Sequence, residues 1–128
     1  FCSPYATAQE ECLQRLLEYE QTKDYTQITH GILLSEEERK RRYIIRHLLI
    51  QPGLSLDEYQ KVFTTAAMEE FPILNDWRKS GYVRLQENHR EQKAGFLSLT
   101  TEGMGLSDYL GPMLISEEVL ALMKTWKA

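Results

Sequence analysis

The sequence predicts a mainly helical α+β domain of the winged-helix type, with three helices, a two-stranded β-hairpin and two C-terminal helices. Two segments open with a serine that is followed three residues later by a glutamate, at residues 35–38 and 55–58, as helix N-termini do. Residues 82–86 and 96–99 alternate between apolar and polar side chains, as half-buried strands do. Three helices followed by such a hairpin are typical of a winged helix.

A helical arm precedes this domain. Residues 7–21 carry leucines at helical spacing, and Ser3 or Thr7 is the expected N-cap. The following residues, up to 34, have the composition of a linker. We therefore expect two parts, an arm and linker over residues 1–34 and a winged-helix-like domain over residues 35–128.

The first helix of the predicted domain runs from Ser35 to about Ile50, and the second from Ser55 to Phe63. A third helical stretch follows Thr64 and Thr65 and reaches Ser80. Pro72 lies inside this stretch and lacks a backbone donor, so a kink or a split is expected there. The expected buried face of the first helix consists of Ile44, Ile45, Leu48 and Leu49.

The hairpin would form the wing, and the polar residues 87–95 would form its long exposed tip. Thr100 or Thr101 is expected to cap a helix that reaches Leu110 and stops at the Gly-Pro pair after it. Ser116 is expected to cap the last helix.

Composition excludes several classes of protein. The 128 residues include 15 basic and 19 acidic side chains, a net charge of −4, which does not favour a strongly basic nucleic-acid binder. The densest apolar run, residues 43–50, is far shorter than a membrane span and is interrupted by Arg46 and His47. Cys2 and Cys12 match no common metal or redox spacing. We expect a cytoplasmic protein with reduced thiols and no membrane partner.

The densest charge run covers residues 36–42 and allows two interpretations. It can be a basic patch for phosphate or carboxylate, or a solvated face whose charges pair with one another at helical spacing. The expected pairs are Glu36–Lys40, Glu37–Arg41 and Glu38–Arg42. The second interpretation is favoured. Arg39 and Arg46 have no such partner, so they are the candidate contacts for an anionic ligand.

No catalytic, metal-binding or phosphate-cradling motif occurs in the sequence. The expected recognition segment, residues 66–80, has one more acidic than basic side chain. Phosphates repel such a surface, so nucleic acid is an unlikely partner on this count. The sequence by itself predicts no catalytic residue.

Several stretches resemble, in order and spacing, the C-terminal domain of oxygen-independent coproporphyrinogen III oxidase-like radical SAM proteins. The resemblance covers about residues 28–128. The stretches are LSEEERKRRYIIRHLL (34–49), GLSL (53–56) with Tyr59, FPIL (71–74), GYV (81–83), LTTEG (99–103) and DYLGPMLIS (108–116).

The resemblance implies that this chain is an accessory domain that covers the substrate of an upstream barrel. That barrel would carry a [4Fe–4S] cluster and S-adenosylmethionine and would decarboxylate the porphyrinogen oxidatively in haem biosynthesis. Cys2 and Cys12 cannot form the Cys-x-x-x-Cys-x-x-Cys motif of the cluster. The fragment would then hold no cofactor and no catalytic residue, although its parent would be an oxidoreductase. Arg39 and Arg46 would contact substrate carboxylates.

The alternative is a free-standing winged-helix module that binds protein or nucleic acid. The first residue is Phe1, which favours a fragment of a longer chain over this alternative.

Overall fold

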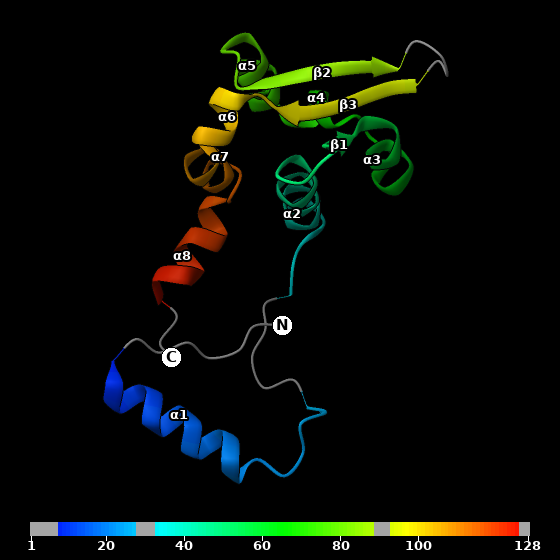
Figure 1. The fold of residues 1–128 in the computed structure, drawn as a ribbon. Helices are drawn as coiled ribbons and strands as arrows, with labels where there is room; N and C mark the ends of the chain where they lie inside the picture. The colour runs from blue at the N-terminus through cyan, green and yellow to red at the C-terminus, as the bar shows by residue number, and fades with distance from the viewer. Residues whose placement is uncertain (1–7, 28–32, 89–92, 126–128) are drawn as a thin grey trace. The chain divides into compact units, whose positions relative to one another are not determined.

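The computed structural model describes residues 8–27, 33–88 and 93–125 (Figure 1). The chain divides into two compact units. One unit consists of Glu36–Glu117, and the other of Phe1–Ser35 together with Glu118–Ala128.

The Glu36–Glu117 unit is mainly helical and contains a small antiparallel sheet, which confirms the predicted winged-helix fold. Its elements in chain order are α2 (Glu36–Leu48), β1 (Leu54–Ser55), α3 (Leu56–Phe63), α4 (Ala67–Glu70), α5 (Ile73–Lys79), β2 (Val83–Asn88), β3 (Lys93–Leu99), α6 (Thr101–Gly105) and α7 (Ser107–Met113).

The sheet has the strand order β1-β3-β2, so the hairpin that the sequence predicts gains a third, short strand. Leu54 of β1 pairs with Leu97 of β3, and Val83 of β2 pairs with Leu99. In Figure 1, β2 and β3 run side by side and β1 lies next to β3. The predicted wing tip falls largely on residues 89–92, which lie outside the described residues.

The core of this unit fills the space between the sheet and the helices. Ile44 and Leu48 of α2 are buried, as the helical spacing predicts, but Leu49 is 37% exposed. The helix ends at Leu48, so Leu49 no longer follows the helical face. The other buried apolar residues are Leu54, Tyr59, Phe63, Ala67, Phe71, Leu74, Trp77, Val83, Leu97, Leu99, Leu110 and Leu114.

The predicted break at Pro72 is present, because α4 ends at Glu70 and Pro72 caps α5. The predicted cap of this stretch is wrong, since the N-cap of α4 is Ala66. Thr64 instead ends α3 in the left-handed conformation, with φ of 60°. The Ser55 cap is confirmed, because its hydroxyl accepts a hydrogen bond from the Glu58 backbone N–H at 3.2 Å.

The helix expected from Thr100 to Leu110 forms as two helices, α6 and α7. Thr100 caps α6 through its hydroxyl, which accepts a hydrogen bond from the Gly103 N–H at 3.1 Å. The expected stop at Gly111 is wrong, since α7 continues through Pro112 to Met113. Helix α7 ends in tight turns, in which the backbone N–H groups of Leu114 and Ile115 donate hydrogen bonds to the carbonyls of Gly111 and Pro112.

The other unit contains α1 (Gln9–Gln21) and almost all of α8 (Glu117–Thr125). The N-cap of α1 is Ala8, with no side-chain hydrogen bond, and the expected caps Ser3 and Thr7 lie outside the described residues. The leucines of α1 are more than half exposed; they are Leu13, Leu16 and Leu17. Among the described residues, no helix is long and apolar enough to cross a membrane.

Candidate functional site

Helix α2 has a side on which its positive charges are neutralised. The Lys40 ammonium lies 2.6 Å from the Glu70 carboxylate and 3.5 Å from that of Glu36. The Arg41 guanidinium pairs with Glu37, so two of the three expected pairs are confirmed.

The third expected pair, between Glu38 and Arg42, is wrong. The Glu38 carboxylate lies 4.0 Å from Nε of Arg41 instead. Arg41 is held on that side of α2 because its Nη1 donates to the Leu114 carbonyl at 3.2 Å and its guanidinium lies 5.2 Å from the ring centre of Phe71. Arg42 is therefore left without an ion pair to any carboxylate of the described residues.

The other side of α2 carries a row of unpaired arginines. Arg39, Arg42 and Arg46 are exposed and lie at positions i, i+3 and i+7, which share one helix face. Together they line a hollow of about 280 Å³ between α2 and α3, which we call the α2–α3 groove. None of the three forms an ion pair within the described parts of the chain. The predicted candidates Arg39 and Arg46 thus lie together, and Arg42 joins them.

Aromatic side chains line the α2–α3 groove together with the arginines. The rings of Tyr43 and His47 are stacked with their centres 3.9 Å apart, and Phe63 meets Tyr43 edge-on at 5.3 Å. Nδ1 of His47 donates a hydrogen bond to the Tyr43 carbonyl at 2.7 Å, which orients the imidazole. Burial raises the pKa of the Tyr43 phenol, and the Glu58 carboxylate raises it further. The Tyr43 side chain is therefore uncharged at neutral pH.

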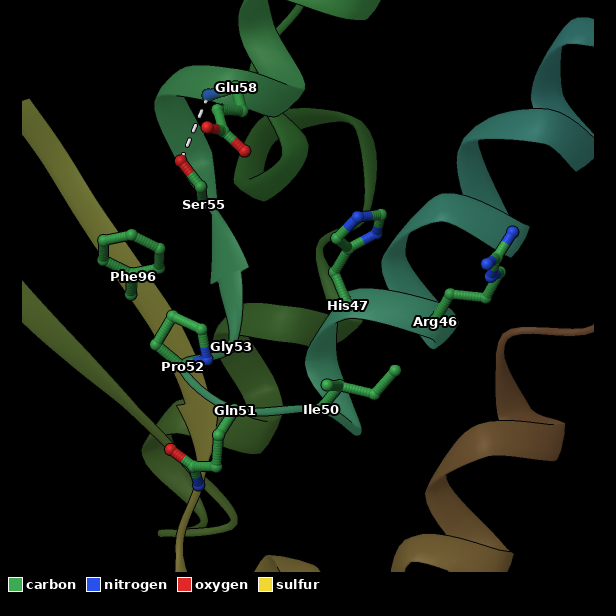
Figure 2. Close-up of a pocket in the computed structure, with 9 residues that line it drawn as sticks. All are labelled: Arg46, His47, Ile50, Gln51, Pro52, Gly53, Ser55, Glu58 and Phe96. Atoms are coloured by element: carbon green, nitrogen blue, oxygen red, sulfur yellow. Dashed lines mark hydrogen bonds between the residues drawn. The ribbon is translucent and has the colours of Figure 1, made fainter.

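A second hollow, of about 500 Å³, shares Arg46 and His47 with the groove. Figure 2 shows the residues that line this second hollow. Its wall includes the turn between α2 and β1, in which Gly53 has φ of +114°. A Cβ at Gly53 would lie 2.5 Å from the Leu97 carbonyl oxygen, so the turn requires glycine. Unlike the groove, this hollow contains a carboxylate, that of Glu58.

A second group of cations lies where α5 meets the hairpin. Arg78 and Lys79 occupy the last turn of α5, and Arg84 follows on β2; all three side chains are exposed. Lys79 lies 3.6 Å from the Asp76 carboxylate, and Nε of Arg84 donates to the Ser98 hydroxyl at 3.4 Å. We call these three residues the α5–β2 cations.

Sequence counting overestimates the negative charge of the recognition segment. Glu70 accepts hydrogen bonds from Lys40, Tyr59 and Thr65, at 2.6, 2.8 and 2.7 Å. Its charge is therefore neutralised by α2, which is 30 residues away in sequence. Only Glu69 and Asp76 then oppose the two cations of α5. No spacing rule along the segment predicts this, because the partner of Glu70 lies on another helix.

Within the described ranges, no group of three or more histidine, cysteine or carboxylate side chains is placed to hold a metal ion. Cys12 lies on α1, and Cys2 is outside the described residues. The structure therefore offers charged surfaces in these ranges and no metal centre.

No protein-family model and no curated protein matches the chain. Solved structures do resemble it. A MepR–DNA complex from Staphylococcus aureus is 15% identical, with a TM-score of 0.40, and 93% of each chain is covered. MepR, a transcription regulator of the multidrug efflux pump MepA of Staphylococcus aureus, is 18% identical with a TM-score of 0.38, over 90% of this chain and 81% of MepR. The transcriptional regulator PA3341 is 14% identical with a TM-score of 0.37, over 90% and 81% of the two chains.

These likenesses correct the expected identity of the chain. The structures it resembles are transcription regulators, not C-terminal domains of radical SAM coproporphyrinogen oxidases, so that resemblance is wrong. The expected oxidoreductase parent, its upstream barrel and its porphyrinogen substrate are withdrawn with it. The expectation that nucleic acid is an unlikely partner is also wrong, because one of these structures is a complex with DNA.

Proposed function

We propose that the Glu36–Glu117 unit is a winged-helix module that binds duplex DNA. In helix-turn-helix proteins the second helix of the motif enters the major groove. Here α4 and α5 follow α3 in that position, and the hairpin follows α5 directly. The observation that carries the proposal is the exposure of the α5–β2 cations at the junction of these two elements.

The net charge of −4 does not oppose this proposal, because attraction to phosphates is local. Charges separated by more than about 8 Å are largely screened at physiological salt. Two carboxylates of the recognition segment also repel phosphates less than a free carboxylate would, since Asp76 lies beside Lys79 and Glu70 is bound to Lys40. Arg78 and Arg84 have no ion pair to a carboxylate in the described ranges and are the stronger candidates for phosphate contacts.

The test is fluorescence anisotropy with a mixed-sequence duplex of about 25 base pairs over a series of salt concentrations, with the whole chain. The variants are Arg78→Gln, Lys79→Gln and Arg84→Gln. Each lost phosphate contact should lower the slope of log affinity against log salt by about 1. Lys23→Gln is the matched control, because it removes one exposed positive charge from the other unit. Undetectable binding at low salt, or a triple variant with unchanged affinity, would contradict the proposal.

A further inference from the structure

We infer that the α2–α3 groove is a binding site for a compact polyanion, a small molecule that carries two or more phosphate or carboxylate groups. Its ligands would be the guanidinium groups of Arg39, Arg42 and Arg46, which line the groove together. Arginine suits this role because its planar guanidinium donates two parallel hydrogen bonds to one oxyanion. The inference is independent of the proposed DNA interface, which lies on α5 and β2.

The two sides of α2 differ in how their positive charges are balanced. The same helix neutralises Lys40 and Arg41 with carboxylates, yet it leaves three arginines unneutralised along the opposite row. Like charges at i, i+3 and i+4 repel one another and destabilise a helix. A bound polyanion would remove this repulsion, because each of its charged groups would replace the missing carboxylate partner.

The α2–α3 groove differs in charge from two other hollows of this unit. The hollow beside the groove contains Glu58, and the one at the start of α2 contains Glu36, Glu37 and Glu70 around Lys40. Carboxylates would repel an anion from both. The α2–α3 groove has three arginines and no carboxylate among the residues that line it. Of these hollows, it is the one whose charge favours an anion.

The length of the arginine row and the volume of the groove limit the size of the ligand. Arg39 and Arg46 are separated by seven residues, which corresponds to about 10 Å along the helix axis. A row of this length offers one guanidinium to each of two or three linked oxyanions. The groove volume of about 280 Å³ lies just below the range of sites for drug-sized molecules, about 300–1,000 Å³. The ligand should therefore be compact, of the size of tripolyphosphate or citrate.

Apolar and aromatic side chains would strengthen these contacts by excluding water from one side of the ligand. Tyr43, His47, Val62 and Phe63 line the groove together with the arginines. The contacts that hold the Tyr43 and His47 rings are internal to the unit, so these rings are held in place without a ligand.

The experiment is isothermal titration calorimetry of the whole chain at about 50 mM salt, with sodium tripolyphosphate and sodium citrate as separate probes. Saturable binding with a stoichiometry of one is expected for at least one probe, and the stronger probe identifies phosphate or carboxylate as the preferred group. Arg42→Gln should weaken binding at least tenfold, and the variant that also carries Arg39→Gln should abolish it. Circular dichroism checks that both variants remain folded.

Arg78→Gln is the matched control, since it removes one exposed arginine outside the groove. It should leave the affinity for the probe unchanged, while Arg42→Gln should leave the affinity for DNA unchanged. The inference would be overturned if neither probe showed saturable binding. It would also be overturned if Arg78→Gln and Arg42→Gln weakened the affinity for the probe equally. It would also be overturned if Arg42→Gln weakened DNA binding as much as probe binding, because the row would then be part of a DNA surface. Failure of DNA binding alone would overturn only the proposed function.

Discussion

The Glu70 carboxylate connects three helices of the winged-helix unit, and its replacement by glutamine tests this connection. It accepts hydrogen bonds from Lys40 of α2, from Tyr59 of α3 and from Thr65, which lies between α3 and α4. The Tyr59 side chain is fully buried. Glu70→Gln keeps the shape of the side chain but removes its charge, so the change acts on the hydrogen bonds and leaves the packing intact.

The expected loss follows from the two hydrogen bonds donated by hydroxyl groups. A hydrogen bond to a charged group contributes about 1.5–3 kcal/mol and one between neutral groups about 0.5–1.5 kcal/mol. Replacing the carboxylate therefore costs about 1 kcal/mol for each of the bonds from Tyr59 and Thr65. Bonds that share one acceptor are not additive, so we expect a loss of about 1–2 kcal/mol in the free energy of unfolding.

The pH dependence gives an independent readout of the same contact. Burial raises the pKa of Glu70, but the hydrogen bonds from Lys40, Thr65 and Tyr59 outweigh it, and the net pKa is lowered. A lowered carboxyl pKa contributes stability above the unfolded-state value, about 4.3, and this stability is lost as the pH falls through the folded-state value. The wild-type chain should therefore lose stability on acidification from pH 5 to pH 3, and Glu70→Gln should lose less.

The assay is urea unfolding followed by the fluorescence of Trp77, which is buried at 4% exposure. A Trp126→Phe background removes the other tryptophan, so the signal reports on the winged-helix unit. Glu69→Gln is the matched control, because its exposed side chain is adjacent and has no ion pair in the described ranges. The reasoning would be refuted if Glu70→Gln differed from this control by less than about 0.3 kcal/mol, or if its acid dependence paralleled that of the wild type.

Three further substitutions test local features of the fold by urea unfolding. Gly103→Ala should destabilise the unit by several kcal/mol or prevent folding, because the new Cβ would lie 1.9 Å from the backbone oxygen of Tyr82. The control is Gly105→Ala on the same helix, whose new Cβ meets no atom within 4 Å and which should be neutral or mildly stabilising. Equal effects of the two substitutions would contradict this prediction. Leu74→Ala should cost about 2–5 kcal/mol, because the side chain is fully buried, and a loss below about 1 kcal/mol would place Leu74 outside the core. Ser55→Ala should cost about 1 kcal/mol through loss of the α3 cap, and Ser55→Asp should restore most of it.

Local chemistry along the chain determined where most elements begin and end. The Ser55 cap, the break at Pro72 and the cap by Thr100 follow from hydrogen-bonding groups within a few residues of one another. The alternating strands follow from side-chain direction alone. Such local signals predict that the elements exist, but they did not predict the conformation of Thr64 at the end of α3 or the continuation of α7 through Pro112. Thr64 adopts the left-handed conformation at the end of α3, and Pro112 lies inside α7, and short-range propensities specify neither.

The charges of the site show where the sequence stops being sufficient. Spacing correctly left Arg39 and Arg46 unpaired, because that argument needs only the helical repeat. It wrongly paired Arg42, because the position of Arg41 depends on the Leu114 carbonyl, 73 residues away in sequence. It also counted Glu70 as an unbalanced negative charge of the recognition segment, although Lys40 pairs with it.

The sequence by itself therefore determined the fold class and the helix that carries the candidate arginines. Only the tertiary structure decided which charges stay free, because a long side chain pairs with whichever group the packing of other elements brings within reach. The contacts of Glu70 with Lys40 and of Arg41 with Leu114 exist only once α2, α4 and the chain after α7 have packed together. These contacts leave Arg39, Arg42 and Arg46 as one unneutralised row.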